Sequence, residues 1–143
     1  LGRIPLGREI ALVRQYLEIE QVRFGDRLTV QAVVGDGAEL VAVPALLLQP
    51  LVENAVRHGI AGLIEGGTVA VSAVRAADRV VVTVSNPRDP DAPPRPGTRL
   101  GLDIVRRRLA AAFGVDAAMT VEPSADAYRV TLTMPAGDGE VTP

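Results

Sequence analysis

The fold of this chain is restricted most by a pair of valine-rich segments joined by a short link. Residues 68–74 read TVAVSAV and residues 79–85 read RVVVTVS. Valine favours strands, and the short polar link Ala76-Ala77-Asp78 predicts that the two strands form an antiparallel hairpin. Further strands are predicted at 27–34 (RLTVQAVV), 118–123 (AMTVEP) and 127–135 (AYRVTLTMP), and the last two form a second hairpin. A sheet is therefore the centre of the predicted fold.

Three helices are predicted, one before these strands and two between them. Residues 7–24 carry an apolar stripe at helical spacing, followed by helices at 44–58 and at 101–113, the last ended by Gly114. Hairpins alternating with helices predict an α+β fold, a two-layer α/β sandwich in which one mixed sheet is covered by helices on one face. The first helix has a second apolar strip, which predicts packing on two sides: Leu12, Tyr16 and Ile19.

Composition excludes several classes of protein. The 143 residues suit one domain, and the absence of cysteine excludes disulfides and thiolate metal sites. A net charge of −2 gives no general attraction to nucleic acid or to an anionic membrane. No apolar run reaches the roughly 18 residues of a membrane span. Because the first residue is Leu, we expect this chain to be a piece of a longer protein.

The predicted second helix, within LLLQPLVENAVRHGI, carries a polar pair beside an apolar face. Leu47, Leu48, Leu51, Val52 and Ala55 share that face, with Gln49, Glu53 and Arg57 opposite. Asn54 and His58 fall at the edge, where they could simply bond to nearby backbone. Alternatively, Asn54 offers an oxygen ligand to a hard cation, and Arg57 with His58 faces an anion. Glu53 and Arg57 could equally form an i,i+4 ion pair.

Two further features accompany this helix along the chain. Asn86 ends a buried strand, and the glycine-bearing turn PGTRLGLDIVRRRL opens the last helix. Backbone N–H groups at a helix start bind anions, and glycine allows a phosphate to approach closely. The proline-rich segment 86–97 between them is predicted to be a loop. The chain thus has a helix with polar residues at the edge of its apolar face, a polar residue at a strand end and a glycine turn before a helix. Together with the loop, these features are typical of a nucleotide-binding site.

These motifs resemble the ATP-binding domain of LytS-type sensor histidine kinases, in the gyrase/Hsp90/histidine-kinase/MutL superfamily, over nearly the whole chain. YLEIEQVRFGDRL (16–28) is similar to the family's segment between the phosphoacceptor helices and the catalytic domain. VPALLLQPLVENAVRHGI (43–60) resembles the N box and is the most specific stretch. VTVSNP (82–87) and GTRLGLDIVRRRL (97–109) lie where the two glycine boxes are expected. The resemblance implies a Bergerat-type ATP-binding fold.

The resemblance also implies roles for individual residues. Asn54 would ligate the Mg²⁺ that bridges the ATP phosphates, and Asn86 would take the place of the aspartate that reads the adenine amine. Residues 87–97 would form the ATP lid. Glu53 could polarise the histidine that accepts the phosphoryl group. The implied nucleotide-binding residues are Asn54, Arg57, His58, Asn86, Gly97, Arg99, Leu100, Gly101 and Leu102.

Three departures from the family pattern bear on affinity. Asn86 replaces an aspartate, which removes a charged hydrogen bond and should weaken adenine binding by ~1 kcal/mol. Pro87-Arg88-Asp89 replaces the glycines expected after it. Arg99 stands where a glycine is usual, where it either clashes with the lid or contacts a phosphate. We expect nucleotide binding to be weakened rather than lost.

The expected function is the catalytic domain of a bacterial two-component sensor histidine kinase. His58, the one histidine, lies inside the N box, so the histidine that accepts the phosphoryl group must lie upstream, and the fragment cannot autophosphorylate alone. The partners implied are ATP, Mg²⁺, a response-regulator receiver domain and, through helices outside this chain, a second kinase subunit. Two alternatives remain: a degenerate nucleotide-binding fold that serves as a non-catalytic docking module, and another superfamily ATPase such as an anti-sigma serine kinase.

The expected organisation of the chain has three parts. Residues 1–26 would end the linker from the phosphoacceptor region, 27–135 would form the ATP-binding domain, and 136–143 would be a disordered tail. We expect a cytoplasmic domain of a membrane-bound sensor protein, with no membrane contact by this fragment.

Overall fold

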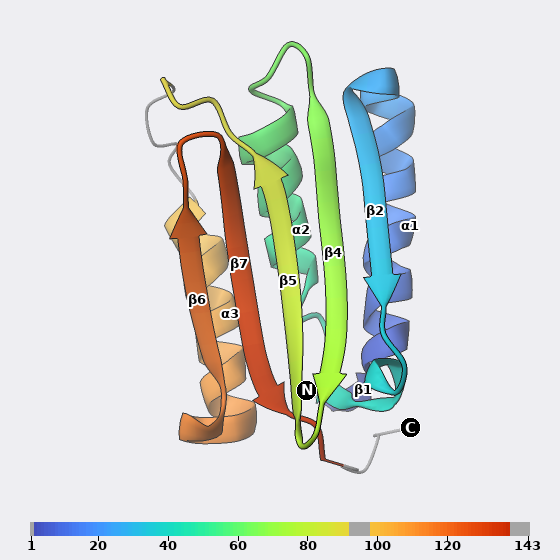
Figure 1. Cartoon of the computed structure of the whole chain (residues 1–143), viewed down its shortest axis with the longest axis vertical. Helices are drawn as coiled ribbons and strands as arrows, with labels where there is room; N and C mark the ends of the chain where they lie inside the picture. Colours follow the sequence, from blue (N-terminus) through green and yellow to red (C-terminus); the bar gives the residue numbers. More distant parts are fainter. Residues whose placement is uncertain (1, 92–97, 138–143) are drawn as a thin grey trace.

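The computed structural model describes residues 2–91 and 98–137 and is built on a five-stranded sheet (Figure 1). The strand order is β2-β4-β5-β7-β6. β2 pairs parallel with β4, and every other neighbouring pair is antiparallel. The predicted mixed sheet and both predicted hairpins are therefore confirmed. The strands are β2 (Leu28–Val34), β4 (Gly67–Ala76), β5 (Arg79–Pro87), β6 (Ala118–Pro123) and β7 (Ala127–Pro135).

The helices lie together on one face of this sheet, as predicted (Figure 1). They are α1 (Leu6–Phe24), α2 (Gln49–Ala55), which continues as the π-helical turn η3 (Val56–Ile60), and α3 (Thr98–Phe113). A small antiparallel pair joins β1 (Arg3–Pro5) to β3 (Ala42–Pro44). Short 3₁₀ turns are η1 (Gly25–Arg27), η2 (Ala38–Leu40) and η4 (Gly114–Asp116). Among the described helices, none is long and apolar enough to cross a membrane.

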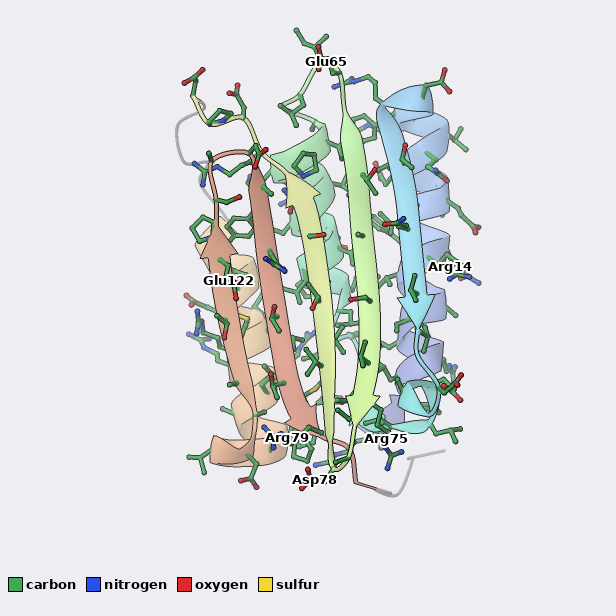
Figure 2. The ribbon with its side chains drawn as sticks, in the orientation of Figure 1. Arg14, Glu65, Arg75, Asp78, Arg79 and Glu122 are labelled. Atoms are coloured by element: carbon green, nitrogen blue, oxygen red, sulfur yellow. The ribbon has the colours of Figure 1, made fainter. Side chains whose placement is uncertain are left out.

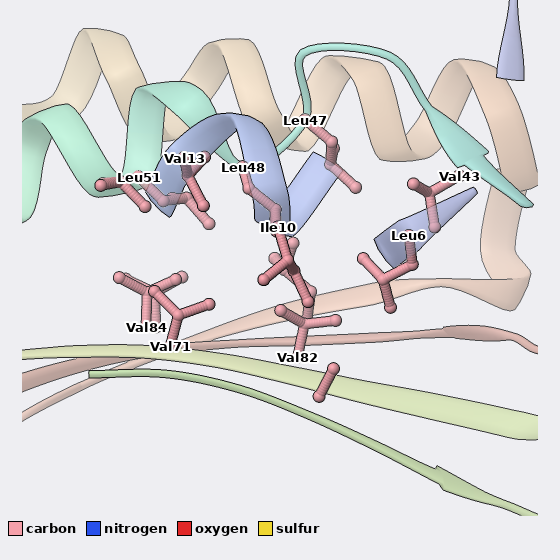
Figure 3. Close-up of a cluster of buried hydrophobic side chains, with 14 of the residues drawn as sticks. Leu6, Ile10, Val13, Val43, Leu47, Leu48, Leu51, Val71, Val82 and Val84 are labelled. Atoms are coloured by element: carbon pink, nitrogen blue, oxygen red, sulfur yellow. The ribbon is translucent and has the colours of Figure 1, made fainter. Parts of the chain in front are cut away.

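The core lies between the helices and one face of the sheet. Along β5 the buried residues alternate with partly exposed ones, and Val80, Val82 and Val84 point toward the helices. Figure 3 shows side chains of α1, α2 and the segments before them meeting Val71, Val82 and Val84 of the sheet. Because aromatic residues are scarce, this core is aliphatic, as the composition predicts.

The two apolar strips of α1 differ in burial. Ile10, Val13 and Leu17 are buried in the core, which confirms the first stripe. In the second strip, Tyr16 is half-buried, whereas Leu12 is 40% and Ile19 is 68% exposed. Leu12 and Ile19 of the second strip therefore face outward, whereas Tyr16 packs at the edge of the core.

The predicted start of the second helix was wrong. Residues 42–44 form β3, Leu46 adopts a left-handed φ of 61°, and α2 begins only at Gln49. Pro50 lies in the first turn of α2, where proline removes no intrahelical hydrogen bond. Proline therefore starts this helix, and the preceding apolar residues belong to a strand and a loop.

The end of β7 is fastened to the β4–β5 hairpin. The Ala136 N–H donates to the Asp78 carbonyl oxygen at 2.7 Å, and Arg75 Nη2 donates to the Ala136 carbonyl oxygen at 3.1 Å. Figure 2 shows Arg75 and Asp78 at this same end of the sheet, with Glu65 at the opposite end. Ala136 is buried, and residues 138–143 of the expected disordered tail lie outside the described residues.

Candidate functional site

The centre of the site is Asn54, a buried polar residue on α2. The predicted apolar face of this helix is confirmed, because Leu47, Leu48, Leu51, Val52 and Ala55 are all buried. Asn54 is only 9% exposed, and its amide makes no hydrogen bond within residues 2–91 and 98–137. No atom of this amide is among the fully buried polar atoms that lack a partner in the described chain. A largely buried residue whose amide makes no bond to the described residues is available to a ligand.

α2, which carries Asn54, packs beside α3. Pro50 precedes Asn54 by one turn on the same side of α2. A Cβ atom placed on Gly101 of α3 would lie 3.9 Å from the Pro50 carbonyl oxygen, an ordinary contact. The beginning of α3 therefore runs beside the helix that carries Asn54. These two helices form the walls of the candidate site.

Glu53 lies on a different side of α2, toward α1. Gln49 Nε2 donates to Glu53 Oε1 at 3.2 Å. Burial raises the pKa of the Tyr16 phenol on α1, the Glu20 and Glu53 carboxylates raise it further, and Arg57 lowers it. Glu53 and Arg57 thus lie near Tyr16, and Arg57 is exposed. The structure places Glu53 with α1 rather than with the wall formed by α3.

The π-helical turn η3 brings the end of the N-box segment against the end of β5. The Ala61 N–H donates to the Val56 carbonyl oxygen at 3.0 Å, which defines the wider turn, and His58 is half-buried within it. A Cβ atom on Gly59 would lie 2.6 Å from Asn86 Nδ2 and 2.9 Å from the Pro87 carbonyl oxygen. Only glycine permits this approach. π-Helical turns occur often at functional sites.

Sequence reasoning missed Gly59. An isolated glycine inside a helical pattern is the signal that could have drawn attention to it, because such a glycine often marks close packing. Its partner, Asn86, was predicted from its place at the end of a strand. The structure brings the two together, so Gly59 belongs to the site.

Asn86 is held in one orientation at the end of β5. It continues the inward-facing row of Val80, Val82 and Val84 and is 6% exposed. Its Nδ2 donates to the Pro87 carbonyl oxygen at 2.8 Å. Because the nitrogen is used in this way, Oδ1 is the atom left to accept a hydrogen bond. Asn86 can therefore accept from a ligand amine, as expected.

The residues after Asn86 begin the predicted lid, and they are tied to the sheet. Pro87 packs on Gly67, where a Cβ atom would lie 2.5 Å from Pro87 Cγ. The Arg88 N–H donates to the Asp126 carbonyl oxygen at 2.9 Å. Residues 92–97, including the predicted site residue Gly97, lie outside the described residues, as do the side chains of Arg99 and Leu100. Gly101 and Leu102 are partly exposed within α3.

The side chains of this site suit a cation that takes few ligands from the protein and most of its ligands from water and phosphate oxygens. Within the described part of the chain, no three His, Cys, Asp or Glu side chains form a cluster that could hold a metal ion. Mg²⁺ in nucleotide sites commonly keeps several waters and takes one or two protein ligands together with phosphate oxygens. Asn54 Oδ1 fits the part of such a protein ligand.

Known proteins similar to this chain are sensor kinases. The chain is 35% identical over 133 residues to the sensor histidine kinase BtsS of Escherichia coli (strain K12), covering 92% of this chain. It is 30% identical over 144 residues to the sensor protein LytS of Staphylococcus haemolyticus, again covering 92% of this chain. The chain spans about a quarter of the length of these relatives, 24% and 25%. No protein-family model matches the chain.

A solved structure has the same fold. The catalytic domain of the histidine kinase ThkA, in a nucleotide-free form, superimposes with a TM-score of 0.71 at 18% identity. The superposition covers 94% of this chain and 96% of that one. At this level of identity the likeness concerns the fold alone.

Proposed function

This chain is homologous to sensor histidine kinases and has the fold of their catalytic domain, and from this premise we propose that it binds ATP with Mg²⁺ and transfers the γ-phosphoryl group to a histidine. The observation that carries the proposal is Asn54, a largely buried residue beside the start of α3, whose amide bonds to no described residue and is not a fully buried atom without a partner. An amide in such a place is available to a ligand.

Each wall of the site has a proposed task. Asn54 Oδ1 ligates Mg²⁺, and Asn86 Oδ1 accepts a hydrogen bond from the adenine amine. Because α3 begins at Thr98, its free backbone N–H groups are those from Thr98 to Gly101, whereas the expected groups from Leu102 onward are used within the helix. The N–H groups of this first turn face the phosphates, and Gly97, Arg99 and Leu100 belong to the same glycine box. Arg57 and His58 lie near the phosphates or the lid. Such an arrangement contributes positioning and charge neutralisation, which dominate phosphoryl transfer.

The acceptor histidine is proposed to lie in another part of the full protein. His58 belongs to the turn that packs on Asn86, so it serves the nucleotide site. Glu53 is proposed to polarise the incoming imidazole, approaching from the side of α1. The phosphoryl group would then pass to the receiver domain of a response regulator. We also propose that the full protein dimerises through helices outside this chain and is a membrane-bound sensor with a cytoplasmic kinase domain.

One observation favours a second candidate, a non-catalytic docking module. Asn86 stands at the end of β5 and carries no charge, so its Oδ1 accepts from the adenine amine more weakly than a carboxylate would. A site with this weaker adenine contact could retain the fold without effective nucleotide binding. The two candidates differ in a measurable property, which is Mg²⁺-dependent affinity for ATP.

Calorimetric titration of the chain with ATP, with and without Mg²⁺ and with GTP as a control, tests the proposal. We expect binding that requires Mg²⁺ and prefers ATP, with Asn54→Ala abolishing it and leaving thermal unfolding close to the wild type. Gln31→Ala removes an exposed amide on the uncovered face of the sheet and serves as the matched control. No binding at millimolar ATP would favour the docking module, and unchanged affinity in Asn54→Ala would remove Asn54 from the metal site.

A further inference from the structure

α1 and the segment that carries Asn54 run side by side in the same direction (Figure 1). The two segments are joined at both ends by charged side chains. Glu9, in the first turn of α1, contacts the start of α2, and Arg27, just beyond the end of α1, contacts the chain after η3. Neither residue carries a role in the proposed chemistry.

Glu9 is a buried carboxylate that binds backbone. It is 1% exposed, Oε1 accepts from the Leu48 N–H at 2.9 Å, and Oε2 accepts from the Leu46 N–H at 3.2 Å. In the described chain, no arginine forms an ion pair with it. A buried charge is retained only where it is well bonded, and a negative charge is favoured at the start of a helix. Both oxygens of Glu9 are thus committed to the residues that lead into α2.

Leu46 shows why this anchor is needed. Its φ of 61° is left-handed, a conformation that leucine rarely adopts and that persists only where the surroundings enforce it. The hydrogen bond from the Leu46 N–H to Glu9 is one of the contacts that enforce it. A second contact is made by Arg108, which donates to the Leu46 carbonyl oxygen. Glu9 therefore fixes the direction in which the chain enters α2.

Arg27 holds the other end of the segment. Its Nη2 donates to the Leu63 carbonyl oxygen at 2.6 Å and to the Ile60 carbonyl oxygen at 3.3 Å. Its guanidinium carbon lies 5.6 Å from the centroid of the Phe24 ring, which packs beside it. The backbone of Arg27 is also in close contact, since a Cβ atom on Gly66 would lie 1.9 Å from the Arg27 carbonyl oxygen. The loop after η3 is thus pressed onto Arg27.

We propose that Glu9 and Arg27 are positioning residues, which hold both ends of residues 46–63 and so place Asn54 and Gly59 relative to Asn86. The inference rests on the proposed nucleotide function and adds a path by which that site is regulated. Both anchors belong to α1 and the turn that follows it. A displacement of α1 along its axis therefore shifts the whole segment and changes nucleotide affinity.

The test compares each anchor with an exposed neighbour of the same charge. Glu9→Gln keeps the size of the side chain but turns an amide donor toward a backbone N–H, and Arg27→Gln removes the guanidinium. Glu18→Gln and Arg23→Gln are the controls, because Glu18 and Arg23 are exposed on α1. We expect about tenfold weaker Mg-ATP binding for each anchor variant, from the loss of one charged hydrogen bond, and a change within about twofold for each control.

Two further measurements separate positioning from simple loss of stability. Affinities are taken at a temperature well below the unfolding transition of every variant, with circular dichroism as the check that each is folded. Arg27→Lys keeps a cation that can donate to the same carbonyl oxygens, so we expect it to recover part of the affinity. Wild-type affinity in Glu9→Gln and Arg27→Gln, together with lowered unfolding temperatures, would overturn the inference.

Amide hydrogen exchange distinguishes failure of the inference from failure of the proposed function. No ATP binding by the unaltered chain would overturn the proposed function. In that case, faster exchange across residues 48–60 in Glu9→Gln than in Glu18→Gln would still support the positioning role. Equal exchange in these two variants would overturn it.

Discussion

The two helical walls of the site are held in different ways. α2 and η3 bury residues along their whole length, and charged side chains of α1 and η1 hold the segment at both ends. From Gly101 onward, the described side chains of α3 include two fully buried ones, Val105 and Leu109. The wall formed by α2 and η3 is therefore buried along its length and held at both ends, whereas the described part of α3 contacts the core through two buried side chains.

Two hydrogen bonds from described side chains attach the second half of α3 to other elements. Arg108 donates to the Leu46 carbonyl oxygen, and Arg3 Nη2 donates to the Ala112 carbonyl oxygen at 2.8 Å. The Arg3 guanidinium also stacks 4.7 Å from the centroid of the Phe113 ring. At Gly101, a Cβ atom would lie 3.9 Å from the Pro50 carbonyl oxygen, so there is room for one more side-chain atom. The proposed metal ligand therefore lies on a wall that has no room for an added atom at Gly59, whereas the proposed phosphate contacts lie beside Gly101, where there is room.

The largest expected effects follow from replacing the glycine of each wall, Gly59 or Gly101, by alanine. In Gly59→Ala, the new Cβ atom would meet Asn86 Nδ2 at 2.6 Å, so we expect a loss of about 1–3 kcal/mol of unfolding free energy from overpacking. In Gly101→Ala, the nearest atom is at 3.9 Å, so helix propensity should make the protein more stable by up to about 1 kcal/mol. Urea unfolding measures both.

The affinity for Mg-ATP gives a second comparison of Gly59→Ala with Gly101→Ala. We expect both variants to bind Mg-ATP more weakly, Gly59→Ala because Asn86 is displaced and Gly101→Ala because the added methyl group obstructs the approach of a phosphate. Gly101→Ala would then be more stable and bind less well. If Gly101→Ala binds as tightly as the wild type, the start of α3 does not contact the phosphates. If Gly59→Ala is as stable as the wild type, the wall formed by α2 is not fixed against β5.

The smallest expected effect is at Asn86. Asn86→Asp restores a charged acceptor for the adenine amine and should tighten ATP binding by ~1 kcal/mol, or several-fold. The same change places an oxygen against the Pro87 carbonyl oxygen, where Nδ2 now donates at 2.8 Å, so the free energy of unfolding should fall. Calorimetry and urea unfolding on one preparation give both quantities. No gain in affinity would mean that Asn86 does not face the base.

Most of the fold could be predicted from the sequence because it depends on local patterns. The valine-rich hairpin, the apolar stripe of α1 and the glycine that ends α3 each depend on residues close together in the chain. Asn86 was found in the same way, as a polar residue that ends a buried strand. The start of α2 was misplaced, because an apolar run before Pro50 looks the same in a helix and in a strand.

The residues missed at the site depend on contacts between distant segments. Glu9 reads as an ordinary polar residue in the first turn of a helix, and its partners lie 37 and 39 residues further along the chain. Arg27 reads as a polar strand start, and it binds carbonyl oxygens 33 and 36 residues away. Gly59 is explained only by Asn86, which lies on a strand of the opposite layer. Periodicity contains no information about such pairs.

Amide hydrogen exchange of the chain with and without Mg-ATP is the decisive measurement for the proposed site, because it locates the ligand as well as detecting it. We expect slower exchange in residues 54–60, at the end of β5 around Asn86 and in the first turns of α3. The larger change should occur at α3, because the N–H groups of its first turn have no partner within the helix and are the ones proposed to bind the phosphates. Binding accompanied by slower exchange only elsewhere, such as on the strands of the uncovered sheet face, would contradict the account.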